Sequence, residues 1–218
     1  MIRTIIADHH GLFRAGVIRL LRDVKAIDVV AEAETGEEAV DLARKLNPHV
    51  VSLEIVMPGI GGLEAARRIL RSETGTQVVI LTGAWDAPYP TQALRSGVCG
   101  FVTKRGAPED VIVAIKRAYA GKRFVSADIA ERLAFQSFDD EANAPFDQLS
   151  SREMQIALMV INCQRVQDIS AHLHLSPKTI NAYRYRIFEK LGISSDVELA
   201  MLAVKHGMVN PVLSSASS

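Results

Sequence analysis

The chain has 218 residues, of which 48% are hydrophobic and 23% are charged, so we expect one large or two ordinary globular domains rather than a disordered chain. Basic and acidic residues number 25 each, and a formal net charge of +0 excludes any argument for a nucleic-acid or membrane partner from overall charge. No apolar run is long enough to span a membrane and no signal-peptide pattern is present, which predicts a cytoplasmic protein. The cysteines Cys99 and Cys163 lack metal-site spacing and are expected to be reduced thiols.

Short apolar runs alternate with helical patterns through the first half of the chain. Each run is rich in Val, Ile or Leu, as is typical of strands that are covered on both faces. Five strand–helix units in succession predict an α/β domain with a five-stranded, doubly wound parallel sheet. The expected strands are 2–7, 28–33, 50–53, 78–82 and 100–103, and the expected helices are 11–24, 36–46, 62–72, 89–96 and 108–120.

Polar side chains stand at the ends of the expected strands, where ligands of parallel sheets bind. Asp8 and His9 follow the first strand, Glu54 follows the third, Thr82 ends the fourth and Lys104 follows the fifth. We therefore expect these side chains to form one pocket.

The pattern changes after Gly121 and becomes purely helical. A helix is expected at 126–136, and an acidic stretch at 138–145 reads as part of a linker that spans 122–145. A second, all-α domain is expected at 146–212, before a flexible tail at 213–218. Its predicted helices are 151–162, with a serine as N-cap, and then 166–173, 177–191 and 195–206.

The second and third of these helices have the pattern of a helix-turn-helix. A short amphipathic helix is followed by a tight connection at 174–176, and Pro177 suits the first turn of the longer helix. That longer helix carries four basic residues and one acidic residue, a local charge of 4 − 1 = +3 in a neutral chain. Positive charge is thus concentrated where a helix-turn-helix meets DNA phosphates.

Helical periodicity divides the longer helix into a core face and a DNA face. Ile180, Ile187 and Leu191 share the apolar face. On the opposite side we expect Asn181, Ala182 and Tyr185 near base edges in the major groove. The residues expected to hold phosphates are Lys178, Thr179, Arg184, Arg186 and Lys190.

Four segments of the second half follow one another in a fixed order: PFD at 145–147, LSPKT at 175–179, YRYRIFEKL at 183–191 and SSDVELA at 194–200. Together with the strand-end residues of the first half, they resemble the NarL/FixJ family of response regulators, and especially its GacA/UvrY group, over nearly the whole chain. The resemblance implies a receiver domain at 1–121 and a LuxR-type helix-turn-helix domain at 146–212. It also implies a transcription regulator, not an enzyme, that binds promoter DNA as a homodimer and takes its signal from a sensor histidine kinase.

Receivers of this family bind Mg²⁺ through a pair of acidic residues, beside an aspartate that accepts a phosphoryl group. The resemblance assigns the hydroxyl and the lysine that contact the phosphoryl group to Thr82 and Lys104, and the switch aromatic to Phe101. It assigns the phosphoacceptor position to Glu54, where the family has aspartate. The acidic pair falls on Asp8 and His9, where the family has two acids.

Both departures oppose ordinary phosphotransfer. The extra methylene of Glu54 moves its carboxylate about 1.5 Å further along the pocket, and a misplacement of about 1 Å can lower a rate about a hundredfold. His9 offers nitrogen where Mg²⁺ prefers oxygen, which leaves Asp8 as a weak Mg²⁺ ligand. Glu54 also places a negative charge near the phosphoryl position and could imitate the phosphorylated state in part.

Three interpretations of Glu54 stay open at this point. The receiver could be constitutively active, it could be a silent scaffold for dimerisation, or the residue could be an engineered substitution in an ordinary regulator. An ion pair between Glu54 and Lys104 is compatible with all three.

Two further classes of function compete with a transcription regulator. A phosphohydrolase-like enzyme could use Asp8, Glu54 and Lys104, but it leaves the helix-turn-helix unexplained. An interaction protein could dimerise with another regulator and block it, but it leaves the basic helix unexplained. His172, His174 and His206 lack metal-site spacing among themselves and are expected on the surface or in domain packing.

Overall fold

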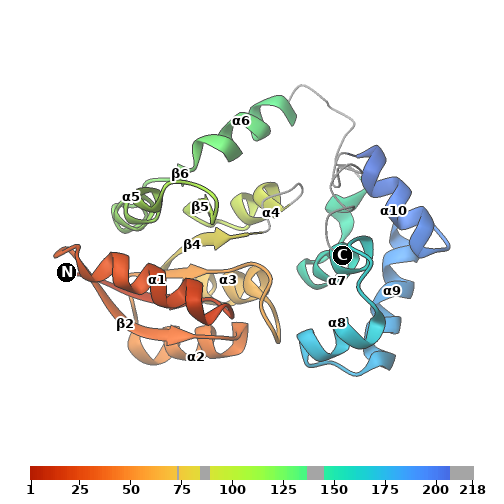
Figure 1. Ribbon diagram of the computed structural model, residues 1–218, viewed down its shortest axis with the longest axis horizontal. Coiled ribbons are helices and arrows are strands. Elements are labelled where there is room, and N and C mark those ends of the chain that lie inside the picture. The colour runs from red at the N-terminus through yellow and green to blue at the C-terminus, as the bar shows by residue number, and fades with distance from the viewer. Residues whose placement is uncertain (73, 84–88, 137–144, 207–218) are drawn as a thin grey trace.

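The computed structural model describes residues 1–72, 74–83, 89–136 and 145–206, which form an N-terminal α/β domain and a C-terminal helical domain (Figure 1). The expected linker segment 138–144 and the tail 213–218 lie outside the described residues. The strands are β1 (Ile2–Ala7), β2 (Ile27–Ala33), β3 (Val50–Leu53), β4 (Gln77–Thr82), β5 (Gly100–Thr103) and β6 (Phe124–Val125). The helices of the first domain are α1 (Gly11–Arg22), α2 (Gly36–Leu46), α3 (Gly62–Leu70), α4 (Tyr89–Arg95), α5 (Pro108–Tyr119) and α6 (Ala127–Gln136).

The sheet is parallel and has the strand order β2-β1-β3-β4-β5-β6. The prediction of five strands was wrong by one, because Phe124 and Val125 add a short sixth strand beside β5. This strand lies within the stretch that the sequence assigned to a linker, and it carries the chain from α5 back to the sheet before the predicted helix α6.

Alternate residues of the strands supply the two cores of this domain. Ile5 and Ile80 pack with the helices α2 and α3 on one face of the sheet. Ile6 and Val79 pack with α1 and α5 on the other face. Because both faces are covered, the polar residues of the sheet collect at the strand ends, where the candidate pocket lies.

The C-terminal domain contains a 3₁₀ turn at Phe146–Gln148 and the helices α7 (Ser151–Ile161), α8 (Val166–Leu173), α9 (Pro177–Leu191) and α10 (Asp196–Lys205). Ser150 caps α7 in a capping box with Glu153, so the predicted serine cap is present. Ser176 caps α9 and Pro177 opens it, while Gly192 ends it in the left-handed conformation.

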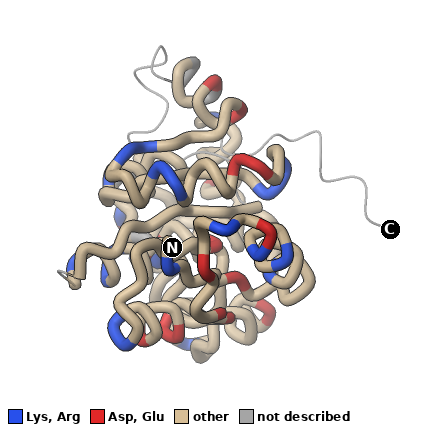
Figure 2. The backbone as a smooth tube through the Cα atoms, turned by 90° about the vertical axis from the view of Figure 1, so that its left-hand side faces the viewer, with Lys and Arg blue, Asp and Glu red and all other residues tan. Residues whose placement is uncertain are grey.

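The two domains share one apolar core. The helix α7 packs against α3, and the buried side chains of α7 continue the cluster that covers one face of the sheet. The helices α9 and α10 lie on the far side of α7 from the sheet (Figure 1). The receiver end of the molecule carries basic and acidic residues interspersed, in keeping with a net charge of +0 (Figure 2). In the part of the chain that the structure describes, no helix has the length and apolar character needed to cross a membrane.

Candidate phosphoacceptor pocket and nucleic-acid interface

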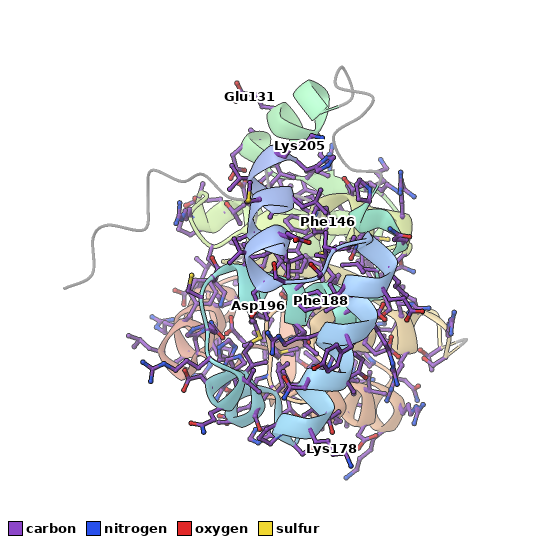
Figure 3. The ribbon with its side chains drawn as sticks, turned by 90° about the vertical axis from the view of Figure 1, so that its right-hand side faces the viewer. Glu131, Phe146, Lys178, Phe188, Asp196 and Lys205 are labelled. Carbon is purple, nitrogen blue, oxygen red and sulfur yellow. The ribbon has the colours of Figure 1, made fainter. Side chains whose placement is uncertain are left out.

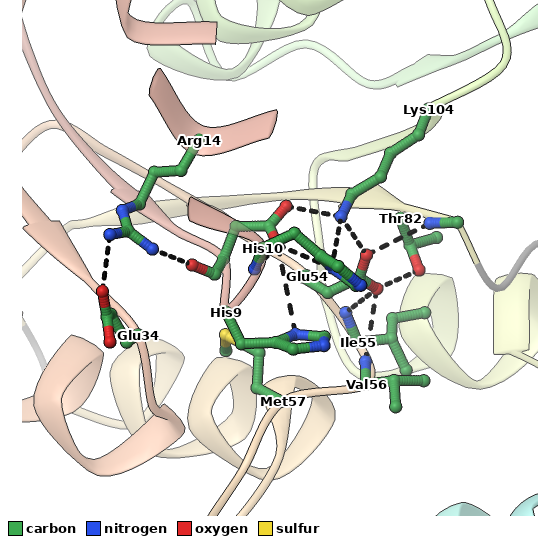
Figure 4. A network of polar contacts seen from close by, with 12 residues as sticks. His9, His10, Arg14, Glu34, Glu54, Ile55, Val56, Met57, Thr82 and Lys104 are labelled. Atoms are coloured by element: carbon green, nitrogen blue, oxygen red, sulfur yellow. Dashed lines mark hydrogen bonds and ion pairs between the residues drawn. The ribbon is translucent and has the colours of Figure 1, made fainter. Parts of the chain in front are cut away.

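The carboxylate of Glu54 lies buried at the end of β3, at the centre of the predicted pocket. Its atom Oε1 accepts hydrogen bonds from the backbone N–H groups of Ile55 and Val56, 2.6 and 3.2 Å away, and from the hydroxyl of Thr82. Its atom Oε2 accepts from the backbone N–H of Gly83 at 3.1 Å and lies 2.7 Å from Lys104 Nζ. Five donors therefore converge on one side chain (Figure 4).

Lys104 joins the two carboxylates of the pocket. Its Nζ lies 2.5 Å from Asp8 Oδ2 and 2.7 Å from Glu54 Oε2, while both carboxylates are almost fully buried. The ammonium group also lies 4.4 Å from the ring centre of Phe13, a cation–π contact that the sequence analysis missed. Removal of one partner from such a buried network costs far more than removal of one partner from a surface ion pair, because it leaves a buried charge uncompensated.

The first residue of α3 lies very close to the backbone of Glu54. A Cβ at Gly62 would lie 1.8 Å from the carbonyl oxygen of Glu54, so only glycine fits where α3 begins. The Gly62 N–H donates to the carbonyl of Ile55 at 2.8 Å, which holds the turn after β3 in place.

His9 and His10 border the pocket on the β1–α1 side, with ring centres 3.8 Å apart. The Nδ1 atom of His10 lies 3.2 Å from Asp8 Oδ1, and the backbone N–H of His10 donates to the same oxygen at 2.9 Å. The Nδ1 atom of His9 lies 4.0 Å from Asp8 Oδ1, too far for a hydrogen bond. Burial lowers the pKa of His9 to about 4, and the neighbouring His10 adds to this effect, so His9 is neutral at pH 7.

The residues of this pocket do not fit the Mg²⁺ ion of an ordinary receiver. Mg²⁺ requires a near-octahedral shell of oxygen atoms. Both pocket carboxylates are instead engaged by Lys104, and the side chain beside Asp8 offers imidazole nitrogen. This arrangement therefore supports no phosphotransfer step that depends on Mg²⁺.

Phe101, the residue in the position of the switch aromatic, is fully buried in the core next to β4. The strand-end residues Asp8, Glu54, Thr82 and Lys104 are brought into contact, whereas Phe101 belongs to the apolar core cluster.

The exposed face of α9 forms a stripe that points away from the receiver (Figure 3). Lys178, Ala182, Tyr185 and Arg186 are exposed, and Tyr185 is 73% exposed despite its large aromatic side chain. Asn181 and Thr179 are half-buried at the edges of the stripe. An exposed aromatic ring between cations on one helix face is well placed for a nucleic-acid groove.

Two of the predicted phosphate-binding residues have partners within their own domain. The guanidinium of Arg184 pairs with the carboxylate of Asp196 at the start of α10 and donates to Asn181 Oδ1 at 2.8 Å. Lys190 Nζ lies 2.6 Å from Glu153 Oε2 and 3.3 Å from the carbonyl oxygen of Gln148. These contacts brace α9 against α7 and α10.

Sequence reasoning missed Gln155, which connects the two candidate sites, whereas it expected His172 on the surface or in domain packing. The side-chain amide of Gln155 donates to the carbonyl of Met57, in the loop that follows Glu54, and its oxygen accepts from Arg152 at 2.6 Å. The ring of His172, on α8, meets the ring of His9 edge-on with centres 5.3 Å apart. A polar residue on an amphipathic helix gives no signal of such long-range contacts.

The comparisons with known proteins cover both domains. Residues 4–116 match the response regulator receiver domain, and residues 147–203 match the bacterial regulatory proteins of the luxR family. The response regulator GacA of Pseudomonas protegens is 51% identical over 213 residues, which cover 98% of this chain and 100% of that protein. The chain belongs to the NarL/FixJ family of response regulators, in its GacA/UvrY group.

Other relatives of this response regulator support the same assignment. UvrY of Escherichia coli (strain K12) is 45% identical and covers 96% of this chain and 97% of its own. Among solved structures, the response regulator RcsB in complex with DNA is 25% identical, with a TM-score of 0.59 and coverage of 94% of this chain and 98% of that chain. The protein is a two-component response regulator with a receiver domain and a LuxR-type DNA-binding domain.

Proposed function

We propose that this response regulator binds palindromic promoter DNA as a homodimer and that its receiver works without phosphorylation. One observation carries the proposal: the carboxylate of Glu54 already holds the contacts of Thr82, Lys104 and the backbone N–H groups of the pocket. In a phosphorylated receiver the same hydroxyl and ammonium group would bind phosphoryl oxygens. Glu54 thus acts as a built-in, partial imitation of the phosphorylated state, with one charge in place of nearly two.

The same contacts argue against a phosphohydrolase-like enzyme. A carboxylate that accepts from five donors is not free to attack phosphorus, and both oxygens of Glu54 are occupied. Phosphotransfer from a sensor histidine kinase is likewise no part of the proposed activity. A regulator that meets promoter DNA in a bacterium works in the cytoplasm.

In the proposed DNA complex, Asn181, Ala182 and Tyr185 read base edges in the major groove, while Lys178, Thr179 and Arg186 contact phosphates. Arg184 and Lys190 lie on the same helix and add positive potential. Their main role is structural, because their ion pairs with Asp196 and Glu153 hold α9 against α10 and α7. The stripe supports this division because its exposed cations face solvent, away from the receiver.

The proposal is tested by measuring the affinity of the full chain for a palindromic duplex selected from a random library, by fluorescence anisotropy at fixed salt. We expect the same Kd with and without acetyl phosphate and Mg²⁺. Glu54→Gln is expected to weaken dimerisation and DNA binding, because its amide would direct a donor at the Gly83 N–H and at Lys104. Tighter binding after donor treatment, with base-labile phosphate on Glu54, would refute the proposal.

A further inference from the structure

One cluster of potential metal ligands borders the pocket and is not used by the proposed function. Among the residues that the structure describes, Asp8, His9 and His10 are the one group of acidic, histidine and cysteine side chains whose ligand atoms all lie within 4.8 Å of one another. His172 of the DNA-binding domain stands beside this group, in edge-to-face contact with His9.

Two ring nitrogens of this cluster lack a hydrogen-bond partner. His9 Nδ1 and His172 Nε2 are both buried from solvent, and neither finds a partner among the described residues. Buried polar atoms of native proteins are nearly always satisfied, so two unsatisfied nitrogens on neighbouring rings point to a bound species. Since a ring nitrogen without hydrogen offers a lone pair, a cation that accepts such a pair would satisfy them.

The ligand atoms of Asp8, His9 and His10 lie close enough together for a single small cation, whereas His172 stands outside this group and must turn its ring to join it. Asp8 Oδ1 lies 3.2 Å from His10 Nδ1, close to the separation of two ligands bound to one ion. Two imidazoles on one tetrahedral zinc ion have ring centres about 5 Å apart, because Zn–N bonds measure about 2.0–2.1 Å. The rings of His9 and His172 have centres 5.3 Å apart. The separation of 4.0 Å between His9 Nδ1 and Asp8 Oδ1 requires only a small ring movement.

Lys104 does not compete for the same carboxylate atom. It lies 2.5 Å from Asp8 Oδ2, whereas Asp8 Oδ1 accepts the backbone N–H of His10 and keeps a second lone pair. Lys104 Nζ also lies 3.4 Å from His10 Nδ1, but the side chain of His10 is 60% exposed, so its ring can turn away from Lys104 and toward an incoming ion. The donor set would then be one carboxylate oxygen and three imidazole nitrogens.

We propose that Asp8, His9, His10 and His172 bind one divalent transition-metal ion of the Zn²⁺ type, which joins the receiver to the DNA-binding domain. Three imidazoles select against Mg²⁺, which prefers an all-oxygen shell, and favour Zn²⁺ with its tetrahedral preference for nitrogen. The ion holds α8 against the β1–α1 loop, so metal binding stabilises the packed arrangement of the two domains.

The test is a titration of the full, metal-free chain with Zn²⁺ against a chromophoric chelator, together with X-ray absorption at the zinc edge. We expect one Zn²⁺ per chain, an absorption signature of three imidazoles and one oxygen ligand, and no competition from a large excess of Mg²⁺. His9→Ala and His172→Ala should each weaken binding at least about tenfold, because every ligand of such a site contributes to affinity. His206→Gln is the matched control, because the ring of His206 packs near Phe146 instead, and this change should leave the affinity unchanged.

Circular dichroism of each variant without metal checks that it folds, and His9→Asn provides a second, polar replacement at that position. A stoichiometry well below one, or an equal loss of affinity in His206→Gln, would overturn the site. An affinity that His172→Ala leaves unchanged would overturn its bridging of the two domains.

Discussion

Gln155, on the first helix of the DNA-binding domain, donates a hydrogen bond from Nε2 to the carbonyl oxygen of Met57, 3.2 Å away in the receiver loop that begins at Glu54. The bond is buried and joins residues 98 positions apart. Since the backbone N–H groups of Ile55 and Val56 in the same loop bind the Glu54 carboxylate, the pocket and the DNA-binding domain share one short segment of backbone. A change at Glu54 can therefore reach α7 through this loop.

The first prediction concerns this bond. Gln155→Ala should lower the free energy of unfolding of the full chain by about 1–3 kcal/mol, because it leaves the buried Met57 carbonyl unsatisfied. Hydrogen exchange of the loop 55–61 should become faster. Gln167→Ala, an exposed glutamine on α8, is the control and should change neither measurement. Equal exchange rates in both variants would show that the Gln155 hydrogen bond does not restrain the loop.

A second prediction concerns Gly61, which faces the same glutamine. Its φ of +74° is a conformation that side chains rarely adopt, and an added Cβ would lie 2.8 Å from Gln155 Oε1. Gly61→Ala should destabilise the chain by about 1–3 kcal/mol through backbone strain. Gly61→Ala should cost less stability in a chain that already carries Gln155→Ala, because the contact with the amide is then gone. Chemical denaturation of the two single variants and the double variant measures this coupling, and strict additivity would contradict it.

Most of the fold could be predicted because periodicity and strand-end rules act locally. The strands β1, β3 and β5 and the helices α2, α8 and α9 have the predicted bounds. The sixth strand was missed because Phe124 and Val125 are only two residues between polar neighbours, too few for a period to show. The tertiary contact with β5, rather than local propensity, makes this segment a strand.

The sites were predictable only where residue type and strand position coincide. Parallel strands place Asp8, Glu54, Thr82 and Lys104 at one edge, so the pocket followed from the sequence. The ion pair of Arg184 could not be predicted, because Asp196 lies on the following helix and a count of charges on α9 does not include it. Contacts between the domains, such as that of His9 with His172, depend on docking geometry that no sequence period encodes.

A third prediction separates the two arginines of α9, the helix proposed to read DNA. Arg186→Ala should weaken binding to every DNA sequence and reduce the salt slope by about one, because the phosphate contact proposed for this exposed side chain is lost. Its effect on stability should be small. Arg184→Ala should chiefly lower stability, because Asp196 loses its partner in a half-buried ion pair. Anisotropy at several salt concentrations and thermal melts of both variants check this division, which fails if their DNA-binding losses are alike.

The fourth prediction concerns pH and the brace between α7 and α9. The pKa of Glu153 is lowered overall: burial opposes ionisation, but the hydrogen bonds from Lys190 and from Ser150 outweigh it. A carboxyl group whose pKa is lowered by folding stabilises the folded chain at pH values above its unfolded-state pKa. This stabilisation is lost as the pH falls through its folded-state pKa. Glu153→Gln should therefore destabilise the chain near pH 7 and make little difference in strong acid. Urea denaturation from neutral to acidic pH measures this, and a difference independent of pH would contradict it.

The last prediction concerns the two departures in the receiver pocket, which act on one phosphoryl centre. Glu54→Asp withdraws the carboxylate by about one carbon–carbon bond, about 1.5 Å, and so frees Thr82 and Lys104 to meet a phosphoryl group. It leaves His9 beside Asp8, so the pocket still lacks the oxygen ligands that Mg²⁺ requires. His9→Asp supplies the missing oxygen, but the Glu54 carboxylate still occupies the same five donors.

Each single change should therefore give only trace phosphorylation by acetyl phosphate and Mg²⁺, and the two together should give far more than the sum of both. A phosphate-affinity gel measures the modified fraction, and cleavage by hydroxylamine identifies it as an acyl phosphate. Removal of Mg²⁺ from the double variant should abolish the modification and so serves as the control. If the unaltered chain takes up as much phosphate as the double variant, then Glu54 and His9 do not block phosphotransfer, and the carboxylate of Glu54 is no substitute for a phosphoryl group.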